Sequence, residues 1–141
     1  MNEAEFSKSI DCSFPYANRE EAIELIDTSL SISTNAAFMV LEELCRPPEG
    51  MAVAKETLLD FIDVWSKKVD HPLARLVVPI ARLMVEGNYL SGREAEKVAK
   101  SIAAFKGQYS ALNIAYFSSD DTDESLETVI HEVRERWDHS E

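Results

Sequence analysis

Apolar residues recur with the spacing of an α-helix along almost the whole of this 141-residue chain. Residues at i, i+3, i+4 and i+7 share one face of a helix, so this spacing produces amphipathic helices. No long segment alternates apolar and polar residues as a half-buried strand does. The sequence therefore predicts an all-α fold, a compact bundle of about six helices in which residues 1–141 form a single domain.

Six segments carry the helical pattern, and Pro, Gly or Ser-rich stretches separate them. The predicted helices cover roughly residues 19–30, 36–46, 51–65, 72–87, 92–117 and 126–137. Residues 1–17 are expected to form an irregular N-terminal segment, and residues 139–141 to fray. Trp65 and Trp137 each stand at the end of an apolar stripe, so both are expected to be buried.

The segment 72–87 is apolar on most of its circumference, which is typical of a helix surrounded by other helices. It is therefore predicted to be the central helix. Pro72 is well suited to the first turn, because its missing N–H has no partner there in any helix. Pro79 is expected to kink the helix, since its ring removes one hydrogen bond and crowds the carbonyl of Arg75.

Two short polar signals mark helix boundaries. The stretch "SISTN" (31–35) should interrupt the pattern, because Ser, Thr and Asn side chains compete with the backbone for hydrogen bonds. Ser91 and Glu94 have the spacing of a capping box, which predicts a helix that starts at about residue 92.

The charge of the chain is uneven along the sequence, with a formal net charge of −12. Residues 1–70 carry −8 and residues 118–141 carry −7, whereas residues 71–117 between them carry +3. Direct binding of nucleic acid or of an anionic membrane is disfavoured, since phosphate contacts depend on Lys and Arg. A basic protein partner is favoured on the same ground, and solubility alone is the alternative explanation.

The acidic run "SSDDTDESLE" (118–127) has two structural interpretations. Asp121, Asp123 and Ser125 have the alternate spacing of an EF-hand loop, but Leu126 occupies the position where that loop needs Gly. Acids just before an apolar stripe suit a helix N-terminus, where carboxylates meet the positive end of the dipole. We interpret the run as a helix start. Its surplus charge then forms an acidic surface that includes Asp120, Asp121, Asp123 and Glu124.

The chain contains no recognisable catalytic, cofactor or metal motif. Four glycines are too few and too scattered for a phosphate-binding loop, and Cys12 and Cys45 have no metal spacing. No secretory signal is predicted, and no apolar stretch approaches the roughly 18 residues of a membrane span. We therefore expect no cofactor, no metal and no membrane association, reduced cysteines with Cys45 buried, and a cytoplasmic protein.

One polar stripe interrupts an apolar segment at 105–117. Lys106, Tyr109, Asn113 and Tyr116 fall on one side of the predicted helix, and buried polar groups need partners. This stripe predicts a pocket or a contact face, since Tyr combines apolar area with a polar tip. The structural alternative places the two tyrosines at the core edge, with the Lys106 ammonium reaching solvent.

Three classes of function follow from these features. The favoured hypothesis is an acidic protein-binding module, an inhibitor or immunity-type protein that neutralises a basic effector such as a nuclease. The second is a small-molecule-binding or regulatory bundle, a homodimer that uses the stripe near Tyr109. The third is an enzyme whose catalytic carboxylates come from separate elements.

Overall fold

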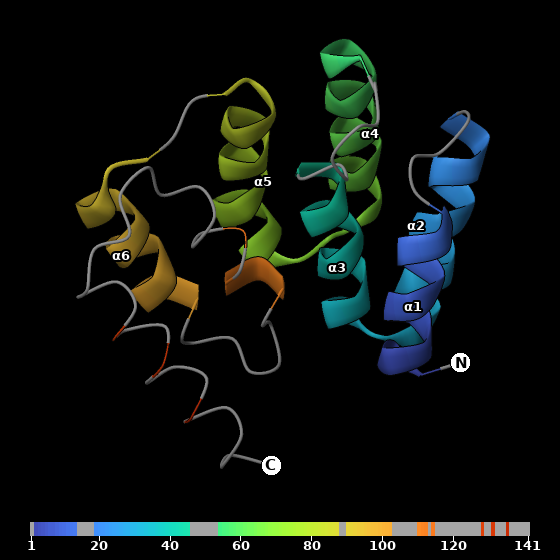
Figure 1. Ribbon diagram of the computed structural model, residues 1–141, viewed down its shortest axis with the longest axis horizontal. Helices are drawn as coiled ribbons and strands as arrows, with labels where there is room; N and C mark the ends of the chain where they lie inside the picture. The colour runs from blue at the N-terminus through green and yellow to red at the C-terminus, as the bar shows by residue number, and fades with distance from the viewer. Residues whose placement is uncertain are drawn as a thin grey trace.

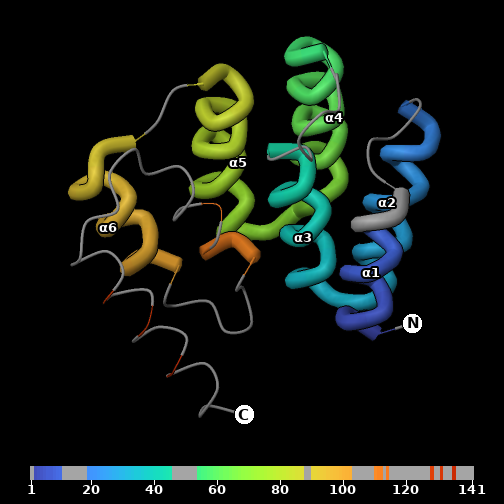
Figure 2. Tube along the Cα trace, in the orientation of Figure 1, coloured from blue at the N-terminus to red at the C-terminus, as the bar shows by residue number. Residues whose placement is uncertain are grey.

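The computed structural model describes residues 2–13, 19–45, 54–87, 90–102, 110–112, 114, 128, 131 and 135. This part of the chain forms six helices: α1 (Glu3–Ser13), α2 (Arg19–Ile32), α3 (Thr34–Cys45), α4 (Lys55–Lys68), α5 (Pro72–Val85) and α6 (Gly92–Ile102). The later described residues also have helical backbone. The predicted all-α fold is confirmed. Figures 1 and 2 show α1 and α2 at one end of the long axis, α6 at the other, and α3, α4 and α5 between them.

Residues 1–17 were predicted to be irregular, and helix α1 corrects this prediction for Glu3–Ser13. The Asn2 side chain caps this helix, because its Oδ1 accepts a hydrogen bond from the Glu5 amide at 2.9 Å. Phe6 and Ile10, four residues apart, point to the same side and are almost completely buried. Two large apolar side chains make too short a stripe to recognise in the sequence, yet they suffice to bind this helix to α3.

Ser33 alone separates α2 from α3, which confirms the break predicted in "SISTN". Its amide still donates to the carbonyl of Ser29 at 3.1 Å, in continuation of α2. Its Oγ accepts from the amide of Ala36 at 3.0 Å, as an N-cap of α3 does. One residue therefore ends one helix and starts the next, and this forces the two helices to pack against each other.

The cap at Ser33 can be tested with a neighbouring serine as the control. Replacing Ser33 by Ala should lower the free energy of unfolding by about 1 kcal/mol, because the Ala36 amide loses its acceptor. Ser31 is exposed, and its hydroxyl donates to the carbonyl of Thr28 within α2. Its replacement by Ala should change stability by less than about 0.5 kcal/mol. Urea unfolding measures both, and equal losses would contradict the assignment.

The core is built around α3, which packs against α1, α2, α4 and α5. Eight of its twelve residues are buried. From α4, the Trp65 indole is fully buried; its Nε1 donates to the carbonyl of Ala37 at 2.7 Å. The Trp65 ring also meets the edge of Phe38, with centroids 5.2 Å apart. The predicted burial of Trp65 is confirmed, whereas Trp137 lies outside the described residues.

Helix α5 starts at Pro72, as predicted, and His71 caps it. The His71 Nδ1 accepts from the amide of Leu73 at 3.1 Å, and its ring faces the edge of Phe38. The helix continues through Pro79 to Val85, and the kink at Pro79 stays a prediction. In Figure 1, α5 stands between the α3–α4 side and α6, the position expected of a central helix, although α3 is more completely buried.

Helix α6 begins with the predicted capping box. The Glu94 amide donates to Ser91 Oγ and the Ser91 amide donates to Glu94 Oε2, both at 3.3 Å. The buried side of the helix carries Ala95, Ala99 and Ile102. Two of these three side chains are methyl groups, so the backbone of α6 can lie close to its neighbours. Its outer side is polar.

Candidate functional site

The two groups of predicted site residues lie outside the part of the chain that the structure describes. These residues are Lys106, Tyr109, Asn113 and Tyr116 of the stripe and Asp120, Asp121, Asp123 and Glu124 of the acidic run. Between the stripe residues, Ser110, Ala111, Leu112 and Ile114 are buried. The Ser110 amide donates to Asn35 Oδ1 at 3.4 Å, so this segment packs on the start of α3. The role of the stripe itself stays a prediction.

The fold separates charge along the molecule. Helices α1, α2 and α3 contain nine acidic and two basic residues, a formal charge of −7. Helices α5 and α6 contain two acidic and five basic residues, a formal charge of +3, and α4 is neutral. In Figure 1, α1 and α2 stand at one end of the long axis and α6 at the other, with α3, α4 and α5 between them, so the acidic end of the described helices, at α1 and α2, lies opposite the basic α6.

The acidic end presents carboxylates along α2. Asp27 is engaged, because its Oδ1 lies 2.9 Å from the Lys68 ammonium of α4. Glu20 and Glu24 are exposed and form no ion pair with another described residue. They stand four positions apart on one face of the helix, where like charges repel in the absence of a partner. Their placement suits contact with a positively charged surface.

A cavity of about 480 Å³ opens at the same end, between α1, α3 and Ser110. Its lining consists of Glu3, Ser7, Ile10, Asn35, Met39, Glu42, Glu43 and Ser110. The Glu3 carboxylate is held in place, since Ser33 Oγ donates to it at 2.5 Å and Asn35 Nδ2 at 3.4 Å. Three carboxylates over two apolar side chains, with no basic residue in this lining, make the cavity attractive to cations.

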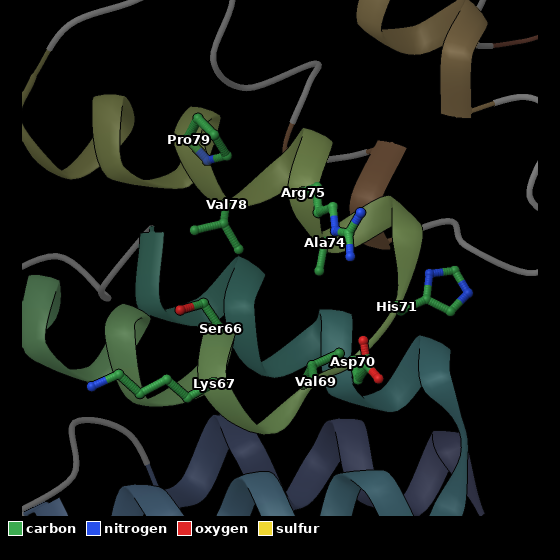
Figure 3. A pocket seen from close by; sticks show the side chains of 9 residues that line it. All are labelled: Ser66, Lys67, Val69, Asp70, His71, Ala74, Arg75, Val78 and Pro79. Atoms are coloured by element: carbon green, nitrogen blue, oxygen red, sulfur yellow. The ribbon is translucent and has the colours of Figure 1, made fainter.

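A larger cavity, of about 640 Å³, lies between α4 and α5 (Figure 3). It is lined by Ser66, Lys67, Val69, Asp70, His71, Ala74, Arg75, Val78 and Pro79. In Figure 3 the side chains of Asp70 and Arg75 lie together at one end of this α4–α5 cavity, and Lys67 lies at the other. The His71 ring points away from them. The cavity thus combines both signs of charge with an apolar wall.

The lysine and the arginine that line the α4–α5 cavity form no ion pair with a described residue, whereas basic side chains next to the cavity do. Arg82 of α5 forms an ion pair with Asp63 of α4, and Lys68 pairs with Asp27. Lys67 and Arg75 are exposed and have no ion pair with a described residue. In a chain with nearly twice as many acids as bases, an unpaired arginine beside a cavity is a candidate ligand contact.

The sequence contained only a partial signal for the α4–α5 cavity. Arg75 and Pro79 stand out as the narrow polar strip of an otherwise apolar helix. Asp70 lies in the turn between two helices and Lys67 near the end of α4, where charged residues are common. Sequence reasoning missed both, because the cavity that they line with Arg75 forms only where α4 packs against α5.

The outer side of α6 is basic. Arg93, Lys97 and Lys100 surround a shallow hollow of about 390 Å³ together with Glu96. Lys100 pairs with Glu96 at 3.3 Å, one turn away on the same helix. Such exposed ion pairs contribute little to stability. The basic side of α6 is compatible with an ordinary solvated surface as well as with a ligand site.

Within the described residues, no group of three or more His, Cys, Asp or Glu side chains is arranged to hold a metal ion. None of the described helices combines the length and the apolar character that crossing a bilayer requires. Comparisons with protein-family models, with curated proteins and with solved structures found no match.

Proposed function

We propose that this chain is a protein-binding module whose acidic end docks a basic protein partner. The observation that carries the proposal is the separation of charge among the described helices, with −7 on α1–α3 and +3 on α5–α6. Charges gathered on one side create a directional field, which orients an approaching partner and raises the rate of encounter.

The docking surface consists of the exposed carboxylates of α2, with Glu20 and Glu24 among them, and the α1–α3 cavity with its three carboxylates. A lysine or arginine of the partner fits that cavity chemically. Its methylene stem would contact Ile10 and Met39, and its charge would meet Glu3. Residues 118–141 carry a further −7, but most of them lie outside the described residues, so their part in docking stays a prediction. A basic effector such as a nuclease, which this chain would inhibit by mimicking phosphate charge, is the most specific form of the proposal.

The double variant E20Q/E24Q tests the surface. Both side chains are exposed, so the protein should stay folded while two negative charges disappear from α2. The partner would be isolated by affinity capture from the native cell at low salt, and its binding followed in real time. We expect the association rate to fall by about twofold to tenfold at low salt, and the difference to shrink as salt is added.

The matched control is E56Q/E86Q. It makes the same change in net charge, but at residues outside α1–α3. The two positions lie in one region of the surface, because the Lys55 ammonium reaches the carbonyl of Glu86 at 3.5 Å. The control should bind like the wild type. If both double variants lower the association rate by the same factor, net charge rather than the α1–α3 surface governs binding. The proposal would then fail.

A second candidate function is the binding of a small molecule near Ser110, in a bundle that forms a homodimer. The α1–α3 cavity favours it, because Ser110 lines this cavity and adjoins Tyr109 of the predicted stripe. The two functions differ in which variants matter. Tyr109→Ala or Asn113→Leu should abolish function under the second. The variant E20Q/E24Q should then do little, and so should the replacement of Asp120, Asp121, Asp123 and Glu124 by Asn and Gln.

A further inference from the structure

We propose that the α4–α5 cavity is a binding site for a small zwitterion of the amino-acid type, with the ligand carboxylate on Arg75 and the ligand ammonium on Asp70. This site is separate from the acidic docking surface and does not depend on it. Asp70 and Arg75 lie together at one end of the cavity in Figure 3, yet they form no ion pair with each other. A ligand that carries both charges can satisfy the two side chains at once.

Arg75 provides the anion-binding half of the site. A guanidinium presents two parallel N–H groups, which match the two oxygens of a carboxylate. The other arginine of α5, Arg82, already uses this capacity on Asp63. Arg75 has no ion pair with any described residue, so its donors face the cavity and solvent. Lys67, at the far end, adds positive charge without competing for the same position.

Asp70 provides the ammonium-binding half. Asp70 is exposed in the turn between the helices and has no ion pair with a described residue. Pro79 also lines the cavity, and it has no N–H to donate to the carbonyl of Arg75, its i−4 partner. That carbonyl therefore lacks its usual helical donor. The Asp70 carboxylate favours a ligand group that donates several hydrogen bonds.

The remaining lining sets the size and polarity of the ligand. Val69, Ala74 and Val78 form an apolar wall, which suits an aliphatic side chain. Ser66 and His71 are engaged in the helix ends, because Ser66 Oγ donates to the carbonyl of Asp63 at 2.8 Å and His71 caps α5. A volume of about 640 Å³ holds a single amino acid together with water. An aliphatic amino acid is therefore the chemical class that fits.

The test uses the full chain, isotopically labelled, and three leucine-based probes that differ in which charges they carry. L-leucine carries both charges, N-acetyl-L-leucine keeps only the carboxylate, and L-leucinamide keeps only the ammonium. We expect saturable amide shifts at residues of the α4–α5 cavity with leucine, and affinities about tenfold lower with either blocked probe. Each blocked probe loses one charge-assisted hydrogen bond, which accounts for a change of that order.

Two variants and one matched control complete the test. Arg75→Gln and Asp70→Asn alter exposed side chains, so both should stay folded and weaken leucine binding by about tenfold. Arg93→Gln removes an arginine from the exposed side of α6 and should leave leucine binding unchanged. The absence of saturable shifts in the cavity would overturn the proposal. So would equal binding of all three probes, or unaltered leucine binding by the Arg75 and Asp70 variants.

Discussion

Replacing Trp65 by alanine is expected to lower the free energy of unfolding by about 3–5 kcal/mol, a large share of the roughly 5–15 kcal/mol that holds a domain together. The indole is fully buried, so its removal leaves a cavity at the junction of α3 and α4. Its hydrogen bond to the carbonyl of Ala37 and its edge contact with Phe38 are lost as well. Urea unfolding followed by circular dichroism measures the change.

Two controls separate these contributions. Trp65→Phe keeps an aromatic ring in the core, and should cost less than the alanine variant because less volume is lost. Leu30→Ala removes a side chain that is 39% exposed, and should change stability by less than about 0.5 kcal/mol. A Trp65→Ala protein with the stability of Leu30→Ala would show that the α3–α4 junction is not part of the core.

Replacing Phe6 by alanine is the second large effect, again expected at about 3–5 kcal/mol. Phe6 is 1% exposed and, with Ile10, makes the buried side of α1. Among the described helices, α1 packs mainly on α3. Loss of the phenyl ring should therefore release α1 before the rest of the bundle unfolds. Hydrogen exchange should show faster exchange of the α1 amides, while those of α3, α4 and α5 keep their protection.

Lys8→Ala is the matched control for Phe6, because Lys8 is exposed on the same helix. It should leave the exchange of the α1 amides almost unchanged, since alanine is as good a helix former as lysine. If the wild-type α1 amides exchanged as fast as those of an unfolded peptide, the first residues would be irregular in solution.

The sequence determined most helix positions, because the features that set them are local. The Ser91–Glu94 capping box, the start at Pro72 and the break at Ser33 each depend on residues within one turn. The face that Leu58, Phe61, Ile62 and Trp65 share is also a matter of spacing, and all four side chains are buried. Helix α1 was missed because its apolar side consists of only two residues. These two side chains stabilise the helix only through their contact with α3.

The candidate sites depended on contacts that no local pattern contains. Charge along the sequence suggested a basic partner, but only the packing of α1 and α2 on α3 gathers those carboxylates at one end. Asp70 and Arg75 stand only five positions apart at the start of α5, but the cavity that they line exists because α5 folds back against α4. Helical period is a property of neighbouring residues, whereas a cavity is the space left between elements. The sequence therefore specified the helices, and tertiary packing decided which side chains meet.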